Sequence, residues 1–134
     1  MAEWVFALAG SAGTTPIEPA RINPERLIPT ILCAAPPQRA IGAAIAARTS
    51  RIRIGTFLVL LPLHNPVRIA EDTATVDLIS RGRFDLGVGL GYRRRKFSDQ
   101  GISHTTRGKR MQEGIAVIQR LLSDESVTFD GEFT

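Results

Sequence analysis

The sequence predicts an α/β fold in which helices cover a parallel sheet. Two observations support this class. Helical and strand patterns alternate as helix, strand, helix, strand, helix between residues 37 and 122, and the first predicted strand, residues 51–61, ends in a continuous apolar run. Alternation of this kind is typical of parallel strands joined by crossover helices. The 134 residues suffice for one domain with a core and are too few for two.

Composition and charge narrow the classes of protein. Hydrophobic residues make up 43% of the chain and charged residues 22%, which is typical of a globular protein. The net charge of +4 admits a nucleic-acid partner, but most basic residues stand singly outside residues 93–96, so we expect none. The only cysteine is Cys33, which excludes an intrachain disulfide and multi-cysteine metal sites. No signal peptide or membrane-length apolar run is present, so we expect a cytoplasmic protein without a membrane partner.

The N-terminal part, residues 1–36, is expected to be irregular. Residues 10–37 hold six of the eight prolines, which fix their own backbone and restrict the residue before them. We expect a long loop there, with one short helical turn near residues 25–34. The six are Pro16, Pro19, Pro24, Pro29, Pro36 and Pro37.

The first helix is predicted to start at Pro37 and run to about Arg48, because proline is favoured at the first helical position. Its apolar stripe would consist of Ile41, Ala44 and Ile45. Residues 51–61 (RIRIGTFLVLL) begin as an alternation and become a continuous apolar run. This pattern predicts a strand buried on both faces of a parallel sheet.

The second helix is predicted to start at Asn65 and Pro66, as N-cap and first helical residue, and to end near Ser80 with Gly82 as the stop signal. Residues near one face would be Ala70, Ala74, Asp77 and Leu78. A strand over residues 83–90 follows at once. Alternation places Phe84, Leu86, Val88 and Leu90 on one side and Asp85, Gly87 and Gly89 on the other.

The C-terminal part is predicted to hold a polar loop at 92–105, a helix at 106–122 and the opening of a hairpin at 127–133. The helix shows an amphipathic pattern with Met111, Ile115, Ile118 and Leu122. The hairpin is suggested by alternation around Asp130 and Gly131. Two strands cannot close a sheet, so we expect that further chain, or another chain, pairs with their edges.

The glycines at positions 87, 89 and 91 admit three interpretations. A dinucleotide fingerprint needs a further glycine where Tyr92 stands and a helix that starts at once. In a parallel barrel, inward glycines would leave space for a flat ligand near the carboxyl ends of the strands. Alternatively, they mark a tight strand–helix packing contact or a bulge. Neither His64, read mainly as a turn residue, nor His104 has a metal-ligand spacing.

Several motifs together resemble the luciferase-like monooxygenases. They are ARTSRIRIGT at 47–56, LPLHNPVR at 61–68, AED at 70–72, DLISRGRF at 77–84 and GVGLGY at 87–92. Phe97, Gly101, Arg107 and the ending FDGEF at 129–133 continue the pattern. The resemblance covers residues 37–134, which form family-like βα units, and treats the chain as one incomplete domain. It implies part of a (β/α)8 TIM barrel, from the end of strand 2 to helix 4.

The resemblance also implies a function. It predicts an oxidoreductase of the monooxygenase type that uses reduced FMN and molecular oxygen on an organic substrate, with a flavin reductase and homo-oligomerisation as possible associations. Cofactor-binding residues carried over from the family are Thr56, Phe57, Leu58, Gly89, Leu90 and Gly91. It further implies a cis peptide bond at Phe57–Leu58. Two alternatives stay open: hydride transfer with a reduced deazaflavin coenzyme, and a non-catalytic truncated remnant.

The chain departs from the family pattern at two places. Residues 3–6 (EWVF) resemble the end of the second barrel strand, where the family often has Glu-His-His-Phe, so Trp4 and Val5 replace both histidines and no catalytic acid or base is assigned. The family commonly has an acidic residue before Phe97, where this chain has Arg93, Arg94, Arg95 and Lys96. We expect these basic residues to attract an anionic cofactor or substrate.

Overall fold

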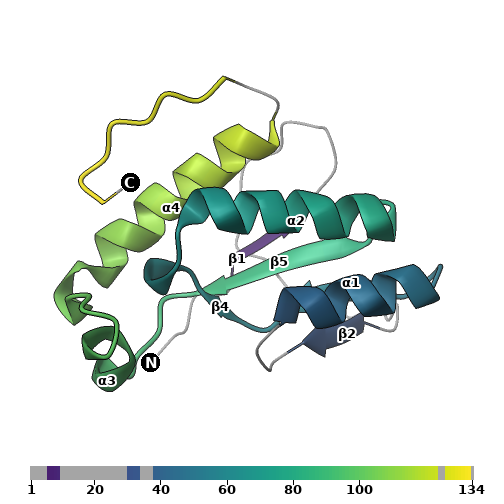
Figure 1. The fold of residues 1–134 in the computed structure, drawn as a ribbon, viewed down its shortest axis with the longest axis horizontal. Coiled ribbons are helices and arrows are strands. Elements are labelled where there is room, and N and C mark those ends of the chain that lie inside the picture. Colours follow the sequence, from purple (N-terminus) through teal and green to yellow (C-terminus); the bar gives the residue numbers. More distant parts are fainter. Residues whose placement is uncertain (1–5, 10–29, 34–37, 124–125, 134) are drawn as a thin grey trace.

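The protein is described from a computed structural model that covers residues 6–9, 30–33, 38–123 and 126–133. One sheet is covered on one face by three helices that lie side by side (Figure 1): α1 (Gln38–Arg48), α2 (Pro66–Ser80) and α4 (Arg107–Leu122). The core lies between this helical layer and the sheet. Its buried side chains include Ile54, Leu61, Ile69, Val76, Phe84, Leu86, Val88 and Ile118. The α/β class predicted from the alternation is therefore confirmed.

The sheet is mainly parallel, in the order β1-β5-β3-β2. Strand β2 (Thr30–Cys33) is parallel to β3 (Arg53–Thr56), and β3 is parallel to β5 (Phe84–Gly89). The short strand β4 (Val59–Leu60) also pairs with β5 in parallel. Strand β1 (Phe6–Ala9) pairs with β5 in the antiparallel direction and lies at the edge of the sheet.

The predicted irregular region, residues 1–36, thus contains two strands, β1 and β2. The short helical turn expected near residues 25–34 is wrong at Thr30–Cys33, because the prolines leave the apolar stretch after Pro29 free to pair with β3. The parallel neighbour of β3 is β2 rather than residues 3–6. Of those four, Phe6 begins the antiparallel strand β1, while Glu3, Trp4 and Val5 lie outside the described residues.

The strand predicted over residues 51–61 is interrupted. It forms β3, then β4, and then a 3-10 turn, η1 (Leu61–Leu63), that contains Pro62. From Gly55 to Val59 the chain advances four residues, while the paired segment of β5, from Asp85 to Val88, advances three. One extra residue is therefore accommodated as a bulge between β3 and β4. The Phe57–Leu58 peptide bond inside it is cis, as predicted.

The bounds of α1 agree with the prediction, but its buried face does not. Gly42 and Ala46 face the core, Ile45 is half-buried, and Ile41 and Ala44 are exposed. Small residues allow the helix to approach the sheet closely, because a methyl group at position 42 would already contact Phe84 and Ile54. Size therefore decided the buried face of this helix more than hydrophobicity did.

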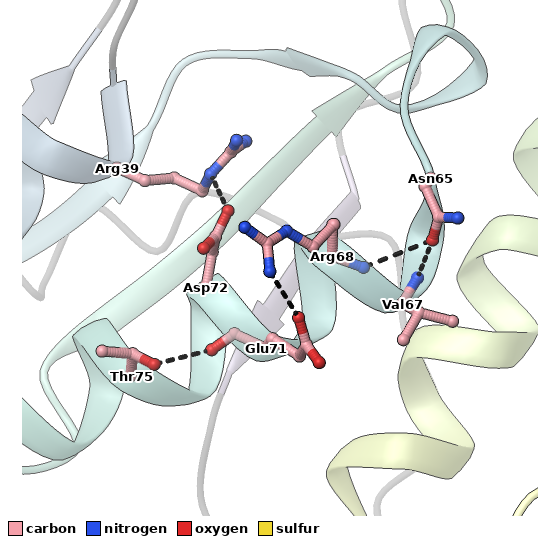
Figure 2. Close-up of polar contacts among 7 residues, drawn as sticks. All are labelled: Arg39, Asn65, Val67, Arg68, Glu71, Asp72 and Thr75. Carbon is pink, nitrogen blue, oxygen red and sulfur yellow. Dashed lines mark hydrogen bonds and ion pairs between the residues drawn. The ribbon is translucent and has the colours of Figure 1, made fainter.

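Helix α2 begins and ends as predicted. The Asn65 side chain accepts hydrogen bonds from the backbone N–H groups of Val67, at 2.9 Å, and Arg68, at 3.3 Å (Figure 2). At the other end, Arg81 adopts a left-handed conformation (φ 58°), and the N–H of Gly82 donates to Asp77. The N-cap and the first-turn proline together explain why the helix starts at Pro66.

The buried residues of α2 are shifted along the helix by about one position from those predicted. The buried residues are Pro66, Ile69, Ala70, Thr73, Val76 and Ser80, whereas Leu78 is 80% exposed. The exposed surface of the helix is mixed, with Arg68 and Glu71 beside Val67, Leu78 and Ile79. Figure 2 shows Asp72 of α2 paired with Arg39 of α1 at 2.6 Å, and Arg68 paired with Glu71 on α2 itself.

The segment after β5 is more ordered than the predicted polar loop. It contains a short helix, α3 (Arg94–Ser98), and a 3-10 turn, η2 (His104–Thr106), before α4. The predicted helix over residues 106–122 is confirmed as α4, with Met111 and Ile118 buried. Gly114 and Val117 complete the buried face, Ile115 is partly buried, and Leu122 is largely outside it.

The predicted hairpin opening is wrong for the described tail, residues 126–133, which contain no strand. The tail instead lies along α4 (Figure 1), where the Glu113 carboxylate accepts hydrogen bonds from the N–H groups of Glu132 and Phe133. Lys109 pairs with Glu132, and the Arg110 guanidinium lies 4.5 Å from the centre of the Phe133 ring. These contacts hold the end of the tail, at Glu132 and Phe133, against α4. Within the described ranges, no helix is long and apolar enough to cross a membrane.

Candidate functional site

The six residues assigned to the cofactor come from two segments that lie side by side at the carboxyl ends of β3 and β5. Residues 56–58 begin with the last residue of β3, and residues 89–91 begin with the last residue of β5. The pairing of β4 with β5 places Leu60 opposite Gly89, which holds the two segments together. Carboxyl ends of parallel strands are where barrels and open α/β sheets place their ligand sites.

Thr56 has a structural task in this arrangement. Its side chain is buried, and its hydroxyl donates to the carbonyl oxygen of Gly87 at 2.9 Å. The same hydroxyl accepts a hydrogen bond from the N–H of Gly87, also at 2.9 Å. The hydroxyl therefore replaces the backbone pairing that the bulge interrupts, and the Thr56 side chain holds β3 against β5.

The glycines of β5 allow a close approach of backbone and side chain. A Cβ atom on Gly87 would overlap the Thr56 carbonyl oxygen, and one on Gly89 would lie 2.9 Å from the Leu58 Cδ1 atom. The space beside these glycines is thus filled by β3 and Leu58. Gly87 and Gly89 therefore mark a tight packing contact, but its partners are β3 and Leu58 rather than the helix that this interpretation expected.

Apolar side chains remain exposed beyond this packed layer. Phe57 is 51% exposed and Leu90 is 38% exposed, although most apolar residues of the neighbouring strands are buried. Tyr92, two residues further along, is 68% exposed. Exposed aromatic and aliphatic groups at the carboxyl edge of a sheet provide an apolar surface on which a planar ring can lie. Of the predicted site residues, Phe57 and Leu90 are therefore the two that are most available to a ligand.

The loop after β5 is anchored by Phe97, which is fully buried. Gly91 adopts a left-handed conformation (φ 76°), and a Cβ atom there would lie 3.2 Å from the Phe97 ring. The His104 ring packs edge-on against Phe97, with ring centres 5.1 Å apart. We assigned Phe97 only as part of the family motif. Its signal was a lone aromatic residue within a highly polar stretch.

His64 lies at the end of η1, where its N–H donates to Leu61 at 3.0 Å, so its predicted role as a turn residue is supported. Burial of part of the ring, and then the charge of Arg39, lower the pKa of His64 below its usual value. A cavity of about 20 Å³ next to it has room for one water and not for a cofactor. Its lining residues, which include none of the six, are Leu61, Pro62, His64, Pro66, Arg110, Gly114 and Phe133.

The amino ends of the strands carry polar contacts of a structural kind. Arg53 of β3 pairs with Asp85 of β5 through two hydrogen bonds, one of them at 3.0 Å, and the pKa of Arg53 is raised mainly by this contact. Arg83, just before β5, donates five hydrogen bonds to residues around the ends of α1 and α2. These contacts lie at the opposite ends of the strands from residues 56–58 and 89–91. Neither contact was predicted from the sequence.

Comparisons with known proteins agree on one family. The family model described as luciferase-like monooxygenase matches residues 28–134. An uncharacterized protein of Mycobacterium tuberculosis is 36% identical over 97 residues, covering 72% of this chain and 34% of that protein. Limonene 1,2-monooxygenase of Rhodococcus erythropolis is 40% identical over 86 residues, covering 64% and 22%. The F420-dependent glucose-6-phosphate dehydrogenase of Kineococcus radiotolerans is 36% identical over 92 residues, covering 66% and 27%.

Solved structures show the same fold. A monooxygenase from Streptomyces bottropensis matches with a TM-score of 0.71 and 35% identity, over 75% of this chain and 30% of that one. The oxygenating component of 3,6-diketocamphane monooxygenase from Pseudomonas putida, in complex with FMN, matches with a TM-score of 0.74 and 21% identity, over 81% and 33%. The chain thus spans about a third or less of the length of these proteins. Its described strands and helices form part of a TIM barrel.

Proposed function

The chain belongs to the luciferase-like monooxygenase family, and we propose on that premise that it contributes to a flavin-dependent monooxygenase. The observation that carries the proposal is the exposed apolar edge formed by Phe57 and Leu90. It lies at the carboxyl ends of adjacent parallel strands, where a barrel places its ligand. The FMN complex of the structurally similar monooxygenase component supports FMN as the cofactor.

The residues at this edge fit a planar cofactor. Phe57 and Leu90 offer an apolar surface that would be buried by the ring of a bound flavin, which is favourable because apolar area leaves water. Leu58 packs closely against Gly89 next to this surface, so no space is left into which Phe57 or Leu90 could move. Bound reduced flavin would supply the electrons for oxidation of a substrate by molecular oxygen.

A deazaflavin-dependent oxidoreductase is the second candidate. It is favoured by one observation: F420-dependent glucose-6-phosphate dehydrogenases of Kineococcus radiotolerans and Amycolatopsis mediterranei are 36% and 38% identical to this chain. Flavins and deazaflavins share a planar tricyclic ring, so Phe57 and Leu90 would serve both. The choice between them depends on groups that contact the polar edge of the ring and its side chain.

The proposal is tested by titrating the chain with FMN and with coenzyme F420 and following cofactor fluorescence. The variant Phe57→Ser removes the exposed aromatic ring without opening the core and should weaken binding of the preferred cofactor by about tenfold. Leu78→Ser is the matched control, because Leu78 is 80% exposed on α2 and away from this edge. If neither cofactor binds, or if both variants bind as the parent does, the proposal fails. Tighter binding of F420 than of FMN selects the second candidate.

A further inference from the structure

The loop after β5 contains Arg93, whose side chain is oriented by its neighbours and still has N–H groups without a hydrogen-bond partner among the described residues. This orientation depends first on the packing of the loop. Phe97 is fully buried, Gly91 lies against one side of its ring, and His104 packs edge-on against it. A loop built on a buried aromatic anchor keeps its exposed residues in a defined position.

His104 connects this anchor to Tyr92. A terminal N–H of Arg107 points at the Nδ1 atom of His104, at 3.1 Å, and donates to the His104 carbonyl oxygen at 2.8 Å. A guanidinium can only donate, so Nδ1 is the acceptor and the ring proton lies on Nε2. That Nε2 atom lies 3.2 Å from the carbonyl oxygen of Tyr92 and donates to it. The backbone of Tyr92 is thus fixed through His104.

Tyr92 in turn positions the side chain of Arg93. The Arg93 Nε atom donates to the Tyr92 hydroxyl at 3.1 Å, and the guanidinium carbon lies 5.5 Å from the centre of the Tyr92 ring. Both side chains are exposed. Within the described part of the chain, the two terminal nitrogens of Arg93 have no hydrogen-bond or ion-pair partner. They form the planar fork that matches the oxygens of a phosphate or a carboxylate.

Other arginines of the chain are used differently. Arg83 donates all its hydrogen bonds to protein oxygens, and Arg53 is paired with Asp85. In the same basic run, Arg95 lies 3.9 Å from Asp99. Arg93 alone among these four combines a fixed orientation with free donors, and it lies in the loop that follows the carboxyl end of β5 at Gly89.

We propose that Arg93, oriented by Tyr92, is an oxyanion-binding residue that takes a phosphate or carboxylate group of the ligand at the carboxyl edge of the sheet. This assignment rests on the proposed function only for the identity of that ligand. The anionic group can belong to the cofactor or to the substrate. In both cases Arg93 selects ligands that carry an oxyanion over those that do not.

The experiment measures binding of inorganic phosphate, FMN and riboflavin to the chain. Arg93→Met should weaken phosphate binding about five- to tenfold, as expected for loss of a bidentate charged contact. Arg94→Met, which removes an equal charge from the neighbouring exposed position, should change it less than about twofold. Tyr92→Phe removes only the hydroxyl and should produce an intermediate loss. Amide NMR shifts of Tyr92 and Arg93 report phosphate binding, and flavin fluorescence reports the other two.

The outcomes separate the sources of the anion. Weaker FMN binding by Arg93→Met with unchanged riboflavin binding identifies the cofactor phosphate. A response to phosphate alone identifies a substrate group. Equal effects of Arg93→Met and Arg94→Met, or no phosphate binding, overturn the inference. Riboflavin reports the ring surface by itself, so its failure to bind counts against the proposed function and leaves the phosphate result intact.

Discussion

Replacing Arg83 by methionine should be among the most destabilising single changes in this chain. Its Nε donates to the Ser80 carbonyl oxygen at 2.7 Å. One terminal nitrogen donates to the Ile52 carbonyl at 2.6 Å and to the Thr49 hydroxyl at 3.2 Å. The other donates to the carbonyl oxygens of Ala46, at 3.1 Å, and Thr49, at 2.8 Å. One side chain therefore joins the end of α1, the start of β3 and the end of α2.

The magnitude follows from what the substitution leaves behind. Methionine keeps the aliphatic stem but supplies no donors, so carbonyl groups at the end of α1 lose their partner. Charge-assisted hydrogen bonds contribute about 1.5–3 kcal/mol each, but water can reach this half-buried group and replace part of them. We therefore expect a net loss of about 3 kcal/mol. Arg83→Lys should recover less than half of this loss, because an ammonium keeps the charge without the planar fork.

Urea unfolding followed by circular dichroism measures the effect. With a slope of about 2 kcal/mol per molar urea, Arg83→Met should move the midpoint down by about 1.5 M. Arg51→Met is the control, because Arg51 is exposed and its side chain has no hydrogen bond or ion pair with the described residues. The reasoning is refuted if Arg83→Met unfolds within about 0.5 kcal/mol of the Arg51 variant, or if Arg83→Lys behaves as the parent.

Two further changes test the packing and the electrostatics. Gly87→Ala places a methyl group against the Thr56 carbonyl oxygen and should lower the free energy of unfolding in urea by about 2–3 kcal/mol. Gly108→Ala is the control, because Gly108 has open space around it in α4, and this change should be neutral or slightly stabilising. Equal effects of the two changes would show that β3 can move away from β5. The pKa of His64 is lowered in the folded chain by burial and then by the charge of Arg39. The unfolded chain therefore binds a proton at His64 more readily than the folded chain does. The free energy of unfolding should fall as the pH drops below about 6.5. His64→Gln should flatten that pH dependence of the free energy of unfolding, and a parallel shift at all pH values would argue against the assignment.

Local chemistry was enough to predict the boundaries of the three long helices, α1, α2 and α4. Asn65 and Pro66 start α2 through a cap and a fixed backbone angle, and these depend only on neighbouring residues. The periodicity of α4 also predicted its length. The family motifs added the positions of the candidate site residues and the cis bond at Phe57–Leu58, which periodicity alone does not reveal.

The buried faces of the helices could not be predicted as well. In α1 the residues that face the core are Gly42 and Ala46, which pattern analysis passes over in favour of the larger Ile41. In α2 the face is shifted by about one position, and Leu78 points into solvent. A shift of one residue rotates a helix by about 100°, so small errors in choosing apolar positions exchange its faces.

What the sequence by itself determined was the alternation of three long helices with strands, the ends of those helices, the family and the two segments of the candidate site. Only the tertiary structure decided that β2 is the parallel neighbour of β3, that the glycines of β5 receive Thr56 and Leu58, and that Arg83 is saturated while Arg93 keeps free donors. The physical reason is one of distance along the chain. Caps, turns and periodicity act between residues a few positions apart, whereas Thr56 and Gly87 are 31 residues apart and meet only because two strands pair.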